Sequence, residues 1–538
     1  MNRRDFLKQA ALGVGALALT FPRVGKSEPV VFQGLESASA EATADKKSRP
    51  NILYILCDDL GFGDVHALNP ERGKIPTPHM DRLVAEGMAF TDAHSSSSVC
   101  TPTRYGIMTG RYNWRTRLQS GVLGGFSPPL IADDRLTVPK LLKQHGYATG
   151  CIGKWHLGMT MPVTKKNGKF GDQIEDGNDG TFHAQMKIAD GPTTRGFDYY
   201  FGISASLDMP PFAFIENDRF TQVPTAKKKW IRTGLAAPDF EAIDVLPTLA
   251  RKACEFFAAR AADAKNGKPF FLYLPLTSPH TPIVPTKEWQ EKSGLNPYAD
   301  FVMQTDAALG TLLAELEKNG LAENTLIIFT SDNGCSPAAK VDELEAKGHF
   351  PSWQLRGYKA DIWDGGHRIP FLTRWPGKIK AGTRSTQIVC LTDLMATCAA
   401  IVGAKLPDNA GEDSVSLLPA LLGTATAPLR EAVVHHSISG HFAIRQDKWK
   451  LELCAGSGGW SSPKEPAARK QGLPRVQLYD MTQDISERAN QQAAQPEVVA
   501  RLTKLLEKYV ADGRSTPGAP QKNDVSIDIW KAKPAKPE

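Results

Sequence analysis

The sequence predicts an α/β protein, with one large domain on a mainly parallel or mixed central sheet flanked by helices and a small antiparallel sheet with a helix after it. Continuous apolar runs bounded by turn residues are typical of strands buried on both faces. Four such runs lie at residues 51–59, 147–153, 270–276 and 325–330. Apolar residues recur at helical spacing between them, at residues 80–88, 137–145, 245–262 and 298–320. Strands that alternate with helices indicate a mainly parallel sheet.

Each predicted strand runs directly into residues that can carry chemistry. In open α/β sheets, ligands bind beyond the carboxyl ends of the strands. We therefore expect one cleft at this edge, lined by Asp58, Asp59, Lys154, His156, His280, Asp332 and Asn333.

Four of these cleft residues offer oxygen ligands, namely Asp58, Asp59, Asp332 and Asn333. Adjacent acids can also form a solvated turn, and Ser-Asp-Asn-Gly can be a plain β-turn. Their position at the ends of two buried strands favours a metal site. Hard oxygen donors select calcium or magnesium over zinc.

The pattern of predicted elements changes after about residue 427, from alternating strands and helices to short strands. Two short strand patterns, 441–445 and 449–453, flank a turn, and a third pattern at 477–480 precedes a helical pattern at 496–509. This predicts a catalytic domain at 50–426 and a small α+β subdomain at 427–513. The segment 514–538 is rich in proline and lysine, so we expect a loosely ordered tail.

Composition indicates a soluble globular protein. The 538 residues are 41% hydrophobic and 23% charged, with a net charge of +6. That charge mildly favours anionic substrates and is too small for a nucleic-acid-binding protein. The eight cysteines are scattered, without the paired spacing of a zinc site.

Residues 1–44 are interpreted as an export signal. Arg3 and Arg4 lie in a segment that resembles a twin-arginine motif, and an apolar run at 10–21 follows, with possible cleavage sites at 38–40 or 42–44. The run is too short to span a bilayer, which takes about 20 residues. The sequence therefore predicts an exported protein, periplasmic or secreted, without a stable membrane span.

Two polar inserts interrupt the α/β pattern, at 160–195 and 203–238, and the second contains Lys227, Lys228 and Lys229. Charge runs of this kind are usually solvated loops. The alternative is that the inserts wall a pocket for an anionic substrate. His183, in the first insert, is left out of the predicted site.

Cys100 begins a stretch with a distinctive spacing. Pro102 is tolerated in a first helical turn, so Cys100 is expected at a helix N-terminus, where an anion is favoured. Arg104 follows at the spacing that brings two side chains to one helix face. A lone cysteine is more often a buried structural residue, but the surrounding pattern points elsewhere.

Cys-x-Pro-x-Arg followed by Thr109 and Gly110 resembles the signature of the type I, formylglycine-dependent sulfatases. The resemblance extends over about residues 50–490. Further matching blocks lie at 153–158, 278–280, 355–359 and 365–370. Within the last blocks, Asp364 stands where glutamate is common and His367 fills a variable position.

The resemblance implies an alkaline-phosphatase-like fold and a sulfuric ester hydrolase. It implies that a formylglycine-generating enzyme oxidises Cys100 to formylglycine, whose hydrate is the nucleophile. It assigns Ca²⁺ to Asp58, Asp59, Asp332, Asn333 and the modified Cys100. It also implies roles for the remaining predicted site residues: Lys154 and Lys359 stabilise the sulfuryl oxygens, His280 assists the leaving group, His156 assists sulfate release and Arg104 holds the network in register.

Export and the resemblance together favour a sulfated saccharide as substrate. Two alternatives stay open: a phosphonate monoester or phosphodiester hydrolase that uses the same Cys-x-Pro-x-Arg pattern, and an inactive protein that binds sulfated glycans. The full set of predicted ligands, lysines and histidines argues against the inactive protein.

Overall fold

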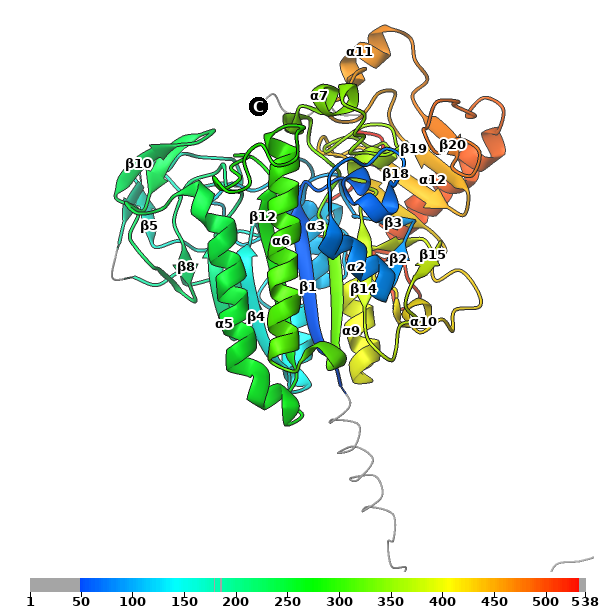
Figure 1. The fold of residues 1–538 in the computed structure, drawn as a ribbon. Helices are drawn as coiled ribbons and strands as arrows, with labels where there is room; N and C mark the ends of the chain where they lie inside the picture. The colour runs from blue at the N-terminus through cyan, green and yellow to red at the C-terminus, as the bar shows by residue number, and fades with distance from the viewer. Residues whose placement is uncertain (1–48, 179, 184–185, 532–538) are drawn as a thin grey trace, which may run out of the picture. The chain divides into compact units, whose positions relative to one another are not determined.

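A ten-stranded mixed sheet forms the centre of the protein in the computed structural model, which describes residues 49–178, 180–183 and 186–531 (Figure 1). The export signal expected at 1–44 lies outside these residues. The strands in spatial order are β15 (Thr383–Ser385), β2 (Met88–Phe90), β14 (Phe371–Arg374), β13 (Thr325–Ser331), β1 (Asn51–Asp58), β12 (Phe270–Pro279), β4 (Ala148–Lys154), β7 (Tyr199–Ile203), β8 (Ile215–Glu216) and β9 (Arg219–Phe220).

The middle of the sheet is parallel, as the buried apolar runs predict. β1 pairs in parallel with β12 and β13, and β4 pairs in parallel with β12 and β7. Asp58 lies opposite Pro279, and Cys57 lies opposite Ser331. The carboxyl ends of β1, β12 and β13 therefore reach the same edge. Antiparallel pairings of β14 and β8 at the two sides make the sheet mixed.

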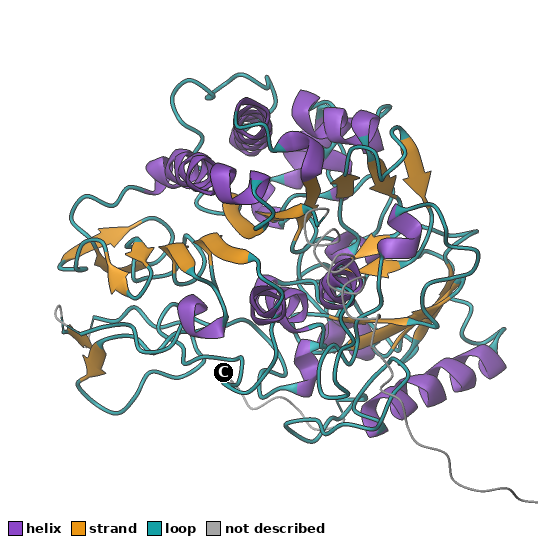
Figure 2. Ribbon diagram, turned by 90° about the horizontal axis from the view of Figure 1, so that it is seen from below, coloured by secondary structure: helices purple, strands orange, loops and turns teal. Residues whose placement is uncertain are grey.

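Helices cover both faces of the sheet (Figure 2). One face packs on α2 (Pro78–Glu86), α5 (Val245–Lys265) and α6 (Pro297–Lys318), and the other on α3 (Cys100–Thr109), α4 (Val138–Gln144) and α9 (Leu394–Val402). Alternate residues of β1 divide between the two cores: Leu53 and Ile55 enter the first, Ile52 and Tyr54 the second. Burial of each leucine or isoleucine side chain contributes about 1.5–3 kcal/mol.

Shorter elements complete the large domain. They are the strand pairs β3 (Ala93–His94) with β16 (Val389–Cys390), β5 (Val163–Lys165) with β6 (Gly180–Phe182), and β10 (Ala226–Lys229) with β11 (Thr233–Ala236), and the helices α7 (Val341–Ala346), α8 (Asp364–His367) and α10 (Leu418–Leu421). In the described part of the chain, no helix is long and apolar enough to cross a membrane.

The small C-terminal sheet lies where the sequence predicts it. Its strands are β17 (Val433–His436), β18 (Phe442–Gln446), β19 (Trp449–Glu452) and β20 (Gln477–Asp480), all antiparallel, with α11 (Glu465–Lys470) in a connection and α12 (Pro496–Ala511) packed on it. The domain boundary at 427 stays a prediction.

The segment that follows α12 differs from the expected loose tail as far as it is described. Asp524 pairs with Arg111, and Asn523 accepts a hydrogen bond from Arg115. Ile529 is buried in the core of the C-terminal sheet. Composition alone misses this packing because the partners of the segment lie about 400 residues earlier in the chain.

Lys450 ties the C-terminal sheet to the large domain. Its ammonium group is fully buried, 2.9 Å from Asp364, 2.6 Å from Glu487 and 3.1 Å from Glu452. We predict that Lys450→Met lowers the free energy of unfolding by about 3–5 kcal/mol, because it leaves buried carboxylates without a cation. Urea unfolding measures this loss.

Lys448→Met is the matched control. Lys448 is half-exposed and pairs with Asp480 at the surface, so its loss is expected to cost about 0–1 kcal/mol. Equal losses for the two variants would contradict the importance assigned to the buried ammonium.

Candidate functional site

The predicted cleft residues meet at the carboxyl edge of the sheet. β1 ends at Asp58, β4 at Lys154, and β12 and β13 lead directly to His280 and Asp332. One oxygen of Asp58, one of Asp59 and one ring nitrogen of His280 all lie within 4.8 Å of one another. The structure therefore brings residues from four strands into one site.

The backbone is strained at two of these positions. Asp59 and His156 have φ values of 70° and 56°, in the left-handed region that residues other than glycine rarely adopt. Gly153 has a φ of 135°, and a Cβ atom on it would lie 1.9 Å from the Pro275 carbonyl oxygen. Only glycine allows this close approach of β4 to β12, which places Lys154 at the site. Strain of this kind concentrates at functional sites.

Cys100 is the first residue of α3, as its sequence context predicts. All ten residues of the helix are buried, and it ends at Gly110 in the left-handed conformation that commonly terminates helices. Burial raises the pKa of the Cys100 thiol, although Lys154 and Lys359 partly oppose this shift. The unmodified thiol is therefore a poor nucleophile at neutral pH.

Three carboxylates in the cleft are each matched by a basic side chain. Asp58 accepts a hydrogen bond from Lys154 at 2.8 Å. Asp59 lies 2.7 Å from Lys359. Arg104 donates from Nε and Nη2 to one oxygen of Asp332, at 3.0 and 2.7 Å. The sequence predicted all six residues, and the structure adds how they pair.

A cation fits among the oxygen atoms of this site. Asp58 Oδ1 and Asn333 Oδ1 are buried but have no hydrogen-bond partner. Burial and the nearby Asp58 carboxylate raise the pKa of Asp332 to about 6. Unpartnered oxygens and crowded carboxylates are what a bound cation would relieve, and the donor set suits a hard cation such as calcium. The predicted metal ligands Asp58, Asp59, Asp332 and Asn333 thus lie together.

Charge keeps Asp58 ionised inside the protein. Burial raises the pKa of Asp58, but Lys154, His280 and Arg104 outweigh this effect and hold it below its usual value. A carboxylate that stays charged at 0% exposure is available to a cation at any physiological pH.

The two predicted histidines differ in how many of their ring nitrogens have partners. His280 donates from Nδ1 to the Thr281 carbonyl oxygen at 2.6 Å, and its Nε2 lies 3.7 Å from Asp59. His156 donates from Nε2 to the Leu123 carbonyl oxygen at 2.7 Å, which leaves its buried Nδ1 without a partner. Burial lowers the pKa of His156 well below its usual value. Neutral His156 can therefore accept a proton at Nδ1.

Two residues at the site, Ser206 and Asp208, were not predicted from the sequence. Ser206 accepts a hydrogen bond from Lys154 at 3.2 Å and lies 3.3 Å from both ring nitrogens of His280. Asp208 forms an ion pair with Arg232. Both follow β7, whose apolar run at 199–203 could have identified a fifth parallel strand and therefore a fifth strand end.

The more exposed residues mark the way into the site. His280, Lys359 and Asp208 retain 5–7% of their accessible surface, whereas Lys154 and Asp332 retain none. Of the site residues compared, His280, Lys359 and Asp208 are therefore the ones nearest to solvent.

The two polar inserts were expected to be either solvated loops or walls of a pocket for an anionic substrate. Lys228 bonds to Glu241 and to the Phe240 carbonyl oxygen, so it does not line the cleft through a free ammonium group. His183 bonds to Thr164 within the β5–β6 hairpin. Asp208, by contrast, comes from the second insert and lies near His280, and it pairs with Arg232 of the same insert. The lysine run lies in strand β10 of the β10–β11 hairpin, so the expected loop is wrong, although Lys227 and Lys229 are exposed. The role of the insert as a pocket wall stays a prediction.

Comparisons with known proteins agree on one family. A family model described as Sulfatase matches residues 50–404. An N-acetylgalactosamine-6-O-sulfatase of Bacteroides thetaiotaomicron is 32% identical, over 89% of this chain and 96% of that protein. Arylsulfatase A of Homo sapiens is also 32% identical, over 88% of this chain and 90% of that protein.

A solved structure gives the same result for the fold. It comes from work on glycosaminoglycan metabolism by Bacteroides thetaiotaomicron, with a TM-score of 0.72 and 30% identity, and covers 86% of this chain and 99% of that one. The alkaline-phosphatase-like fold implied by the sequence resemblance is confirmed.

Proposed function

Because the chain belongs to the sulfatase family and is a sulfuric ester hydrolase, we propose that it removes sulfate from a sulfated carbohydrate, with calcium as its metal and with Cys100 converted to formylglycine. The observation that carries the proposal is the buried N-terminus of α3. Cys100 stands there beside paired acids and bases whose free oxygens, Asp58 Oδ1 and Asn333 Oδ1, suit a hard cation.

Calcium would be held by Asp58, Asp59, Asp332, Asn333 and the modified Cys100, and would polarise the sulfate group as a Lewis acid. The hydrate of formylglycine would supply the attacking hydroxyl, so a separate formylglycine-generating enzyme is the partner that this proposal needs.

The lysines provide fixed positive charge for the sulfuryl oxygens. Lys154 is held by Asp58 and Ser206, and Lys359 by Asp59. Because these contacts fix the ammonium groups before substrate arrives, little reorganisation is needed as charge develops. Arg104 also donates to the Lys154 carbonyl oxygen at 2.9 Å, so it ties α3 to the end of β4.

The histidines divide the proton transfers. His280 lies on the open side of the site, where it can deliver a proton to the departing oxygen of the sugar. His156 is fully buried with a free Nδ1, where it can take a proton as sulfate leaves the protein. One covalent cycle needs a proton delivered in its first half and removed in its second.

We predict that His280→Ala lowers the turnover rate of an alkyl sugar sulfate by about 10²–10⁴-fold, the usual contribution of a general acid. The turnover rate of a nitrophenyl sulfate should fall much less, because its leaving group needs little protonation. His156→Ala should slow both substrates alike and leave a sulfated form of the protein detectable by mass spectrometry. Steady-state rates on the two substrates measure the difference.

His183→Ala is the control, since His183 bonds only within its hairpin among the contacts described and should change neither rate. Equal losses on both substrates for His280→Ala, without a trapped form for His156→Ala, would reverse or remove the assigned roles.

The substrate class rests on two supports: relatives named for N-acetylgalactosamine 6-sulfate hydrolysis, and the export signal expected at 1–44. The experiment is a panel of sulfated saccharides that includes N-acetylgalactosamine 6-sulfate, assayed beside aryl phosphodiesters and phosphonate esters. Faster turnover of the phosphorus esters would favour the alternative hydrolase. Binding without turnover by protein that contains formylglycine would favour the inactive binder. We further propose that the protein acts outside the cytoplasm.

A further inference from the structure

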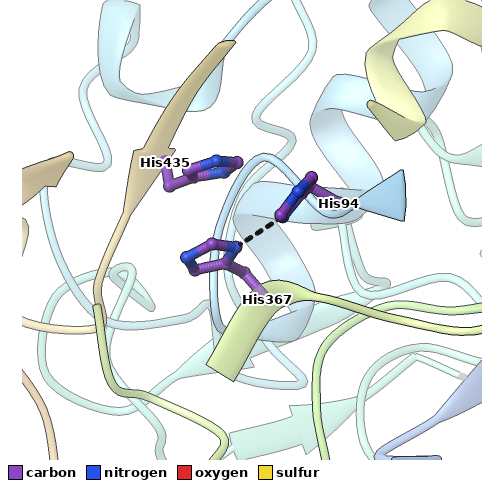
Figure 3. A group of neighbouring side chains, drawn as sticks. All are labelled: His94, His367 and His435. Carbon is purple, nitrogen blue, oxygen red and sulfur yellow. Dashed lines mark hydrogen bonds between the residues drawn. The ribbon is translucent and has the colours of Figure 1, made fainter. Parts of the chain in front are cut away.

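Three histidines from distant parts of the chain meet inside the protein and take no part in the proposed reaction (Figure 3). His94 comes from β3, His367 from α8 and His435 from β17. All three have 0% exposure, and one ring nitrogen of each lies within 4.8 Å of one ring nitrogen of each of the others.

In His94 and His367, the ring nitrogen that points away from the cluster has a hydrogen-bond partner. These partners determine which ring nitrogen carries the hydrogen. His94 Nε2 lies 2.7 Å from Asp92 Oδ1, and His367 Nε2 lies 3.0 Å from the Ile362 carbonyl oxygen. A carbonyl oxygen can only accept a hydrogen bond, and the same is true of an ionised Asp92 carboxylate. Asp92 pairs with Arg445 at 2.8 Å and with Arg368 at 3.7 Å, and these two cations stabilise its carboxylate form. Each Nε2 therefore carries the hydrogen.

A neutral imidazole has one N–H group, so the Nδ1 atoms of both rings carry lone pairs. These two Nδ1 atoms nevertheless face each other at 3.0 Å (Figure 3). Two lone pairs at that distance repel unless a cation lies between them. The cation can be a shared proton or a metal ion.

His435 adds a third lone pair. Its Nδ1 lies 3.3 Å from the Ser95 carbonyl oxygen and donates to it, while its buried Nε2 has no partner. The His435 ring stacks on His367 with centroids 3.8 Å apart, and lies 4.7 Å from His94. A proton shared by His94 and His367 would leave His435 Nε2 unsatisfied, which is costly inside a protein.

The outer contacts of the rings leave three nitrogens to face inward. The groups behind the rings accept from Nε2 of His94, Nε2 of His367 and Nδ1 of His435, so the lone pairs lie on Nδ1 of His94, Nδ1 of His367 and Nε2 of His435. Neutral imidazoles are the form that binds a transition metal.

We propose that His94, His367 and His435 bind one divalent transition metal of the zinc class. Imidazole nitrogens suit zinc and its neighbours, whereas calcium prefers oxygen, so this site and the cleft would select different metals. Zinc–nitrogen bonds are about 2.0–2.1 Å long, so two nitrogens 3.0 Å apart can share one ion. His435 must tilt out of its stack to join them.

The groups behind the rings match the outer partners of known metal sites. Ligating histidines usually donate their other N–H to a carboxylate or a backbone carbonyl, which orients the ring. Asp92 does this for His94, and the carbonyl oxygens of Ile362 and Ser95 do it for the other two rings.

A metal here would brace the loop that leads to Cys100. Ser95 donates its backbone N–H to the His367 carbonyl oxygen at 2.8 Å, and Ser97 donates its hydroxyl to the His436 carbonyl oxygen at 2.9 Å. The ion would fasten β17 of the C-terminal sheet to β3 and α8 of the large domain, on either side of this loop.

The test uses the full chain, stripped with a chelator and then loaded with zinc or cobalt(II). We expect one ion per chain by elemental analysis, and anomalous scattering from crystals of the zinc-loaded protein that places it at the three ring nitrogens. His94→Gln, His367→Gln and His435→Gln should each weaken binding by at least about 100-fold, and Asp92→Asn by about 10–100-fold.

His436→Gln is the matched control, because His436 is the buried neighbour of His435 but not part of the cluster. It should leave binding unchanged, and so should Asp332→Ala in the catalytic cleft. The proposal is overturned if the stripped chain takes up neither metal in excess, or if the three histidine variants retain it equally. A metal-free chain with His94 protonated on both nitrogens by nitrogen-15 NMR would show a shared proton instead. If a variant fails to fold, the anomalous map of the unaltered chain decides.

Discussion

Cys100→Ala is expected to abolish sulfate ester hydrolysis and to leave the fold intact. Loss of a covalent nucleophile typically lowers turnover by on the order of 10⁶-fold. Alanine keeps the backbone of α3, whose first turn is held by contacts other than the thiol, including the Thr103 hydroxyl bond to the Ser97 carbonyl oxygen at 2.9 Å. Rates on a nitrophenyl sulfate and circular dichroism measure the two parts of the prediction.

Peptide mass spectrometry tests the modification itself. In protein produced with the maturing enzyme, the peptide that contains Cys100 should be lighter than the cysteine form. Cys398→Ala is the control, because Cys398 is also buried but lies within α9, in the apolar core. This variant should keep full activity. An active preparation in which every Cys100 is an unmodified thiol would refute the formylglycine proposal.

Asp332→Ala is expected to lose calcium and activity together. Asp332 Oδ1 accepts from the Asp59 backbone N–H at 3.3 Å, and Oδ2 holds Arg104. Its removal takes away a proposed ligand and leaves a buried guanidinium without its closest carboxylate. Because a catalytic metal contributes several kcal/mol, turnover should fall by at least about 10³-fold. Elemental analysis and steady-state rates measure the two losses.

Asp413→Asn separates loss of the metal from loss of a buried ion pair. Asp413 binds Arg115 through both of its oxygens at 2.8 Å and is as buried as Asp332, but lies outside the cleft. This variant should lower stability and still bind calcium. Full activity of the unaltered enzyme after exhaustive chelation would contradict the calcium proposal. A transition metal that is bound by the unaltered enzyme and lost in Asp332→Ala would also contradict the calcium proposal. A transition metal held by His94, His367 and His435 would stay bound in that variant.

Local patterns predicted the centre of the fold because its strands are buried on both faces. The runs that became β1, β4, β12 and β13 needed no partner to be identified, and the reactive residues at their ends followed from a general property of parallel sheets. β12 extends to Pro279, three residues beyond its predicted end, because it continues to pair with β1 past an irregularity in register.

Features that depend on distant partners were not predictable in this way. Ser206 was missed because the run at 199–203 is only five residues long and borders a polar insert. The packing of Asp524 depends on Arg111, and the meeting of His94 with His435 depends on a C-terminal sheet whose register no local pattern specifies. Periodicity identifies elements, but it does not identify which buried polar groups will meet.

Under the formylglycine proposal, the burial of Cys100 sets a time limit on its oxidation. In the folded protein the residue is 3% exposed, and the surroundings of α3 include segments made much later, such as the one that pairs Asp524 with Arg111 across 413 residues of sequence. At a synthesis rate of about 5–20 residues per second, those residues emerge roughly 20–80 s after Arg111. During that interval the contacts made by the later segment are absent, so we expect the thiol to be more accessible to a maturing enzyme than it is in the folded protein. The yield of active enzyme would then depend on the rate of Cys100 oxidation relative to the rate of chain synthesis. Slower synthesis should therefore raise the fraction of chains in which Cys100 has become formylglycine.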